Sequence, residues 1–175
     1  MKQIRKGVFE TNSSSVHAMC IATEPKKLVI PHEVQLYFDK FGWGEDSISH
    51  TQGKLDYALT ALFHTYIDDY NAVCDNLYKL YDWLKEDNIR FYSWGVGDAV
   101  FGKTIYYDDP IWHNCGSLDH GREAKEFVDY IFENKENMWN FLFSDDSYVM
   151  TGNDNDDSIP YINESYPHET FIKGN

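Results

Sequence analysis

The chain has 175 residues, of which 29 are acidic and 15 are basic, and its formal net charge is −14. This length suits one domain, residues 1–175, and an aromatic content of 17% is too high for a disordered protein. Because nonspecific binding to nucleic acids and to anionic membranes depends on basic side chains, we expect no direct nucleic-acid binding and no membrane association.

Signals for export and for disulfide formation are missing from the sequence. No segment approaches the roughly 18 consecutive apolar residues of a membrane span, and no apolar signal core follows the basic N-terminus. The cysteines Cys20, Cys74 and Cys115 show no paired spacing. We therefore expect a cytoplasmic protein with reduced thiols.

Short apolar runs at the start of the chain predict strands. The clearest run is 16–22, which lies between a serine-rich segment and Thr23-Glu24-Pro25. Similar but weaker patterns predict strands over residues 3–9, 27–30 and 34–41. The order in which these strands pair cannot be read from the patterns, because none of the runs is long.

The middle of the chain has the apolar spacing of amphipathic helices. Apolar residues recur every three to four positions over 54–67 and again over 73–84, with Asp68 and Asp69 near the break between the two segments. These segments predict a helical hairpin, or one long bent helix, with an acidic outer face.

Strand and helix patterns alternate in the second half of the chain. Strands are predicted over residues 89–94, 105–107 and 147–151, and helices over 124–131 and 138–143. The sequence therefore predicts an α+β fold, in which a small mixed or antiparallel sheet packs against a central helical hairpin and a C-terminal helical segment.

A run of small polar residues near the N-terminus is the first candidate site. Hydroxyl groups and backbone N–H groups in a tight loop are suited to an anion such as phosphate, and a basic side chain could add charge. The alternative is a turn whose hydroxyls bond to their own backbone, with the histidine packed in a strand. The candidate ligand-binding residues are Arg5, Glu10, Asn12, Ser13, Ser14, Ser15 and His17.

Metal binding is suggested only weakly. His113, Cys115 and His120 are of the residue types that bind zinc, but a fourth ligand with regular spacing is missing. The acidic run 153–157 resembles the start of a calcium loop, yet serine stands where the loop needs glycine. We expect no cofactor.

Acidic residues along the helical region, together with the later acidic run, form the second candidate site. They are either a solvated surface or a surface that imitates the phosphates of DNA and meets a basic protein partner, with aromatic residues as anchors. The candidate partner-binding residues are Asp68, Asp69, Asp75, Asp82, Trp83, Asp154, Asp156 and Asp157.

The N-terminal sequence Phe9-Glu10-Thr11-Asn12-Ser13-Ser14-Ser15, followed one residue later by His17, resembles the start of a group of small bacteriophage and prophage proteins. The later segment Leu118-Asp119-His120 and residues 141–155 are also similar to that group. The resemblance implies a viral origin. It assigns no activity and no role to any residue.

The leading functional hypothesis is a non-enzymatic phage protein that inhibits a host defence system of the anti-CRISPR or anti-restriction type. It would act in the host cytoplasm by binding a basic nucleic-acid-handling protein. A nucleotide-binding or nucleotide-processing protein built on the N-terminal serine run is one alternative, and a metal-dependent hydrolase is another. The sequence predicts no particular oligomeric state.

Overall fold

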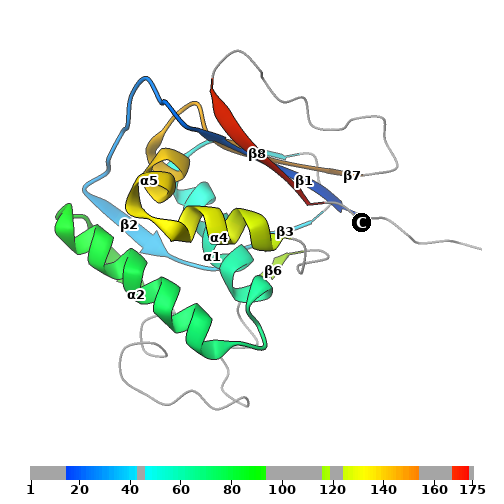
Figure 1. The fold of residues 1–175 in the computed structure, drawn as a ribbon, viewed down its shortest axis with the longest axis horizontal. Coiled ribbons are helices and arrows are strands. Elements are labelled where there is room, and N and C mark those ends of the chain that lie inside the picture. Colours follow the sequence, from blue (N-terminus) through cyan, green and yellow to red (C-terminus); the bar gives the residue numbers. More distant parts are fainter. Residues whose placement is uncertain (1–14, 43–45, 94–115, 119–123, 154–166, 174–175) are drawn as a thin grey trace, which may run out of the picture.

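The computed structural model describes residues 15–42, 46–93, 116–118, 124–153 and 167–173 (Figure 1). Four of the strands form one antiparallel sheet in the order β4-β7-β1-β8. Their bounds are Asp46–Ile48 for β4, Tyr148–Asn153 for β7, Ser15–Ala22 for β1 and His168–Lys173 for β8. The predicted strands over 16–22 and 147–151 are therefore confirmed as β1 and β7, which pair with one another.

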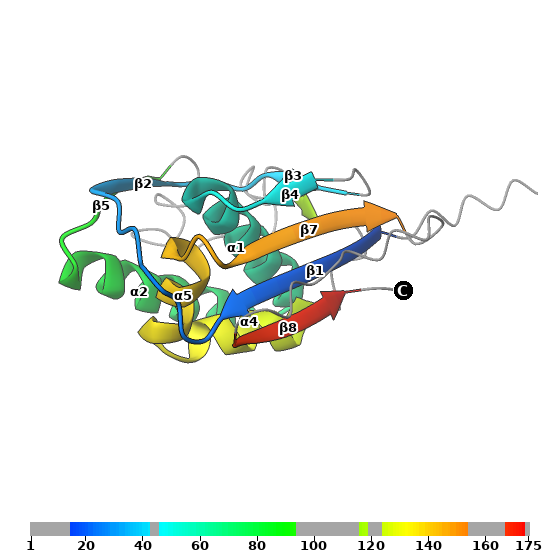
Figure 2. The same cartoon turned by 90° about the horizontal axis from the view of Figure 1, so that it is seen from above.

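The central position of β1 explains its nearly continuous apolar sequence. Residues from Ala18 to Ala22 are at most 1% exposed. The strands β7 and β8 flank β1 on its two edges, and its inner face meets the helices (Figure 2). Met19 and Ile21 belong to the hydrophobic core. A strand buried on both faces has no polar alternation, as β1 shows.

The described residues form four helices, and Figure 2 shows three of them, α1, α4 and α5, on one face of the sheet. Two helices come from the middle of the chain, α1 (Thr51–Thr65) and α2 (Tyr70–Glu86), and two from the later part, α4 (Lys125–Glu133) and α5 (Lys135–Phe143). The predicted helical hairpin and the two helices predicted in the later part of the chain are all confirmed. Asn134 ends α4 and caps α5, since its side chain accepts a hydrogen bond from the N–H of Asn137 at 2.9 Å.

The two helices of the hairpin differ in burial. All residues from Lys54 to Phe63 of α1 are buried, whereas α2 buries only one stripe, formed by Val73, Leu77, Leu80 and Leu84. Figure 1 shows α2 on the outside of the molecule, with α1 and α4 between it and the sheet. A helix that is buried on all sides must find internal partners for its polar side chains.

Two short parallel pairs complete the described fold, β2 (Glu33–Leu36) with β5 (Arg90–Ser93), and β3 (Lys40–Phe41) with β6 (Ser117–Leu118). The predicted strand 34–41 is thus two strands with different partners. The predicted strand 27–30 is wrong, because only Leu28 forms a bridge, to Ser144. The mixed α+β class itself is confirmed. The predicted strands 3–9 and 105–107 lie outside the described residues.

Lys54 joins α1 to the turn between α5 and β7. Its side chain is 1% exposed, and its Nζ donates to the carbonyl oxygens of Ser144 at 2.6 Å and Ser147 at 3.1 Å. Burial lowers the pKa of Lys54 to about 8, although nearby Asp145 opposes the shift. Because both carbonyls accept from this ammonium group, the lysine fixes the turn against the middle of the molecule.

None of the helices in the described ranges is long and apolar enough to cross a membrane.

Gly116 allows the close approach of β6 to the residue before β3. Its φ is 69°, and a Cβ atom placed there would lie 2.0 Å from the carbonyl oxygen of Asp39. That same oxygen accepts a hydrogen bond from the N–H of Ser117 at 3.0 Å. A side chain at position 116 would therefore separate the two segments.

We expect Gly116→Ala to lower the free energy of unfolding by about 2–4 kcal/mol, since both the φ angle and the contact with backbone oppose it. Gly42→Ala is the matched control, because a Cβ at Gly42 meets nothing within 4 Å and its φ is not in the left-handed region. The control should change stability by less than about 0.5 kcal/mol in urea denaturation. Equal effects of the two substitutions would contradict this account of Gly116.

Candidate functional site

The structure places Ser15 and His17, two of the predicted ligand-binding residues, in the interior at the start of β1. Both are 0% exposed. Nε2 of His17 lies 3.1 Å from the carbonyl oxygen of Gly42, and Nδ1 lies 3.0 Å from the hydroxyl of Tyr57. A carbonyl only accepts, so Nε2 carries the proton of the neutral ring and Nδ1 accepts from the tyrosine.

This geometry does not fit a ligand-binding role for His17, because both ring nitrogens already form hydrogen bonds within the protein. Tyr57 is also fully buried, its hydroxyl lies 3.3 Å from the sulfur of Met19, and burial raises its pKa far above the usual range. The tyrosine therefore stays neutral and acts as a hydrogen-bond donor. The structure matches the alternative interpretation of His17, a histidine packed in a strand.

The remaining residues of the predicted N-terminal site, Arg5, Glu10, Asn12, Ser13 and Ser14, lie outside the described residues.

A cavity of about 310 Å³ lies next to Gly42, the residue that accepts from His17. Four elements and the loops beside them line it: β3, β4, the first turns of α1, and β7. Its polar lining residues are Asp39, Lys40, Ser47, His50, Asp56 and Thr151.

Asp56 on α1 is the most buried charged residue of this cavity, at 9% exposed. Its Oδ1 accepts a hydrogen bond from Nε2 of Gln52 at 2.7 Å. Burial is the main cause that raises its pKa to about 6; the carboxylate of Asp39 adds to the shift, and Gln52 opposes it. Near neutral pH, Asp56 is thus a charged carboxylate whose charge the surroundings disfavour.

Gln52 holds Asp56 in position. The Gln52 amide also bonds to the backbone of Gln35 on β2, accepting from its N–H at 3.0 Å and donating to its carbonyl at 2.6 Å. The side chain thus links α1 to β2 and sets the orientation of one carboxylate oxygen of Asp56.

A hydrogen bond fixes the wall of the cavity that lies opposite Asp56, and a glycine shapes the wall formed by α1. The backbone N–H of Asp39 donates to Oγ1 of Thr60, which is fully buried on α1, at 3.1 Å. On the α1 side, a Cβ placed at Gly53 would lie 2.7 Å from Ile48 and 2.8 Å from the ring of His50. The glycine therefore leaves room for the imidazole at the start of α1.

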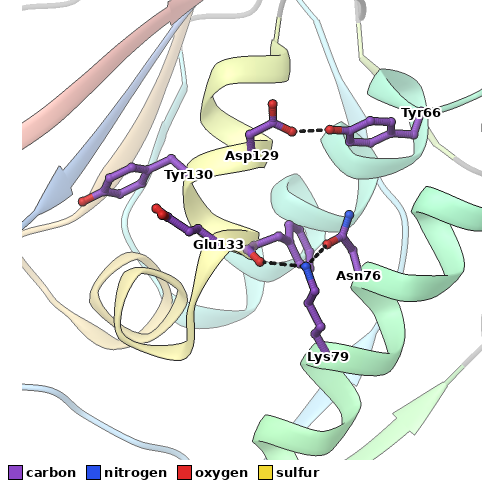
Figure 3. A pocket seen from close by; sticks show the side chains of 7 residues that line it. Tyr66, Asn76, Lys79, Asp129, Tyr130 and Glu133 are labelled. Atoms are coloured by element: carbon purple, nitrogen blue, oxygen red, sulfur yellow. Dashed lines mark hydrogen bonds between the residues drawn. The ribbon is translucent and has the colours of Figure 1, made fainter.

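A second, more open cleft of about 430 Å³ lies between α2 and α4 (Figure 3). The hydroxyl of Tyr66 bonds to Asp129, which also pairs with Lys125. Across the cleft, Nζ of Lys79 donates to the carbonyl oxygen of Phe132 at 3.3 Å. That carbonyl belongs to the last turn of α4, where a cation is favourable, so Lys79 ties the two helices together.

Tyr130 marks the outer edge of this cleft and stands among carboxylates from three elements. Its pKa is raised first by burial and then by Glu169 of β8, Glu133 of α4 and Glu136 of α5. Among the residues that the structure describes, none of these three glutamates forms a salt bridge. The ring packs against Phe171, with the centroids 5.3 Å apart. We call Tyr130 and these three glutamates the Tyr130 face.

The predicted partner-binding residues of the helical region divide into two groups. Asp68, Asp75 and Asp82 are exposed, as the hypothesis requires. Asp69 instead caps α2 by accepting from the N–H of Ala72 at 3.1 Å, and Trp83 packs edge-on against Trp139. These two residues have structural roles in addition to any surface role.

The other predicted site residues cannot be placed. The acidic residues Asp154, Asp156 and Asp157, and the metal candidates His113, Cys115 and His120, lie outside the described residues. Within the ranges that are described, no group of three or more histidine, cysteine, aspartate or glutamate side chains is arranged to hold a metal ion.

No protein-family model matches the chain, and no curated protein or solved structure matches it either.

Asp39, His50, Asp56 and the Tyr130 face were not among the predicted site residues. Asp56 carried a usable signal, because Lys54 and Asp56 are charged residues inside a segment of helical apolar spacing. Glu133, Glu136 and Glu169 carried no such signal in the sequence, because β8 comes close to α4 and α5 only in the folded protein.

Replacing Asp56 tests whether burial disfavours its charge and raises its pKa. An acid whose pKa is raised on folding binds more protons in the folded state, so stability falls as pH rises from about 4 to about 6. Asp56→Asn keeps the hydrogen bond from Gln52 without the charge, and should raise the free energy of unfolding by about 1–2 kcal/mol at pH 7, with a smaller gain near pH 4.5. Urea denaturation at both pH values measures this, with the exposed Glu24→Gln as control. A gain that does not change with pH would refute the raised pKa.

Tyr57→Phe tests the interior role of His17. The substitution leaves Nδ1 of His17 buried without its donor, and we expect a loss of about 1–2 kcal/mol in the free energy of unfolding. The cooperativity of the urea transition should not change. An unaltered midpoint would show that the hydrogen bond is not needed.

Proposed function

We propose that the protein is a non-enzymatic acidic inhibitor that binds a basic nucleic-acid-handling protein of a host defence system, and that the Tyr130 face is its main contact surface. The observation that carries the proposal is the set of three unpaired glutamates around one partly buried tyrosine. Such a face complements lysine and arginine side chains, and a tyrosine supplies contact area at low cost in rotamer entropy.

The neighbouring cations support this assignment, because they are already engaged within the protein. Lys125 pairs with Asp129, and Nζ of Lys135 lies 2.7 Å from Asp87 and 3.1 Å from Glu86. Lys79 donates to the end of α4. Within the described part of the chain, these contacts leave the glutamates of the Tyr130 face without a competing cation, so their charge is available to a partner.

The acidic residues of α2 would add long-range attraction without close imitation of DNA. Asp75 and Asp82 stand two helical turns apart, which is about 10.5 Å along the axis. Duplex DNA carries about six phosphate charges over that length. We therefore assign α2 to steering of the encounter and the Tyr130 face to the contact itself.

The two alternatives from the sequence gain no support from the described residues. The nucleotide hypothesis relied on the serine run, whose described members Ser15 and His17 are buried. The metal candidates of the hydrolase hypothesis lie outside the described ranges. The viral origin remains an inference from the N-terminal resemblance.

Two matched triple variants test the proposal: Glu133→Gln with Glu136→Gln and Glu169→Gln, and Asp68→Asn with Asp75→Asn and Asp82→Asn. Binding to purified CRISPR effector nucleases and restriction endonucleases would be followed by biolayer interferometry. The glutamine variant should lose about tenfold or more in affinity through faster dissociation, and the α2 variant should mainly slow association.

Affinity of the unmodified protein should also fall steeply as salt rises from about 0.05 to about 0.3 M. Duplex DNA should compete with the protein for its target. A partner bound equally well by both variants, or bound without salt dependence, would contradict the proposal.

A further inference from the structure

We propose that the cavity beside Asp56 is a binding site for a small molecule or side chain that carries a guanidinium or ammonium group. The site is separate from the Tyr130 face, so the inference does not depend on the proposed partner. Four features of the cavity lead to it.

The first feature is an available acceptor. Asp56 is buried to about nine-tenths and lines the cavity, and Gln52 bonds only to its Oδ1. Its Oδ2 accepts no hydrogen bond from the part of the chain that the structure describes. This oxygen is therefore open to a hydrogen-bond donor that enters the cavity.

The second feature is the charge of that donor. Asp39 lines the same cavity, and its carboxylate disfavours the charge of Asp56. A cation between the two carboxylates would replace their repulsion by two attractions, whereas a neutral donor would leave the repulsion in place. Guanidinium groups are especially suited to carboxylates, because they present several N–H donors in one plane.

The third feature concerns the remaining charged and titratable groups, Lys40 and His50, which also line the cavity. His50 precedes α1, and its ring lies over Gly53, so the positive end of the helix points to the same region. These groups disfavour a cation at their own position. They therefore orient a ligand, with its cationic end at the carboxylates and a polar or anionic end toward His50.

The fourth feature is that the charge of Asp56 is not needed for folding. The hydrogen bond from Gln52 would be made equally well by the amide oxygen of an asparagine. Residues that lower the stability of the fold are frequent at functional sites. A bound cation would offset the unfavourable burial of the Asp56 charge and would gain binding energy from it.

Binding should depend on pH through Asp56. A proton and the ligand compete for the carboxylate, so affinity should fall as pH drops through about 6. With this pKa, we expect about tenfold weaker binding at pH 5 than at pH 7.

Methylguanidinium and methylurea form a suitable pair of probes, because they have nearly the same shape and differ in charge. Titration of each into the isotope-labelled full chain would be followed by the amide NMR signals of Gly53 and Thr151, at constant ionic strength. We expect saturable shifts with methylguanidinium and none with methylurea. Asp56→Asn should weaken binding at least tenfold, while Glu24→Gln should bind as the unmodified protein does.

A second variant distinguishes a loss of binding from a loss of folding. Gly53→Ala places a methyl group against the ring of His50, which must move, while both carboxylates are kept. Thermal melts of both variants would confirm that they fold, and Gly53→Ala should also bind more weakly. Equal binding of the two probes, or unchanged binding by folded Asp56→Asn, would overturn the proposal.

A capped Gly-Arg-Gly peptide distinguishes the two sources of the cation. Binding of the peptide as tight as that of methylguanidinium would support an arginine side chain of a macromolecule as the occupant. Binding of methylguanidinium alone would support a free small molecule.

Discussion

Complete burial of α1 is the constraint on which the rest of the described structure depends. A helix that exposes one face can leave polar side chains in water, but between Lys54 and Phe63 this helix exposes none. Three of the polar side chains in that stretch therefore bond to another part of the fold. Lys54 reaches the turn before β7, Tyr57 reaches β1, and Thr60 reaches the residue before β3. These polar contacts position the surrounding elements as much as the apolar packing does.

Asp56 differs from these three residues, because only one of its two oxygens accepts a hydrogen bond from the described part of the chain. Near the end of α1, Nε2 of His64 and Oγ1 of Thr65 are also buried without a hydrogen-bond partner among the described residues. Part of the cavity lining comes from the short strands β3 and β4, which contribute few side chains to fill the space. The Tyr130 face has another origin, because it arises where the edge strand β8 meets the junction of α4 and α5. The two proposed sites, one in the cavity and one on the outer surface, thus share no residue.

Sequence patterns predicted those elements in which the spacing of the apolar residues matches the surface that the element buries. The apolar run of β1 and the three-to-four spacing of the helical hairpin are of this kind, and both were located closely. The split of 34–41 into β2 and β3 was not predictable, because it follows from two partners far along the chain, Arg90–Ser93 and Ser117–Leu118. The cavity was missed for the same reason. His17 was noticed for its polar neighbours, although its role is set by Tyr57, 40 residues away.

The arrangement of β1 has a consequence for how the chain folds. This strand is synthesised early, yet its two neighbours are β7 and β8, so His17 pairs with Thr151 and with Lys173. Contacts of such sequence separation form slowly, because a long loop must close before they contribute. Until β8 has left the ribosome, the apolar central strand has an open edge, and nascent chains carry an exposed template for aggregation. Rapid completion of synthesis, or a chaperone that covers β1 in the interval, would shorten this exposure.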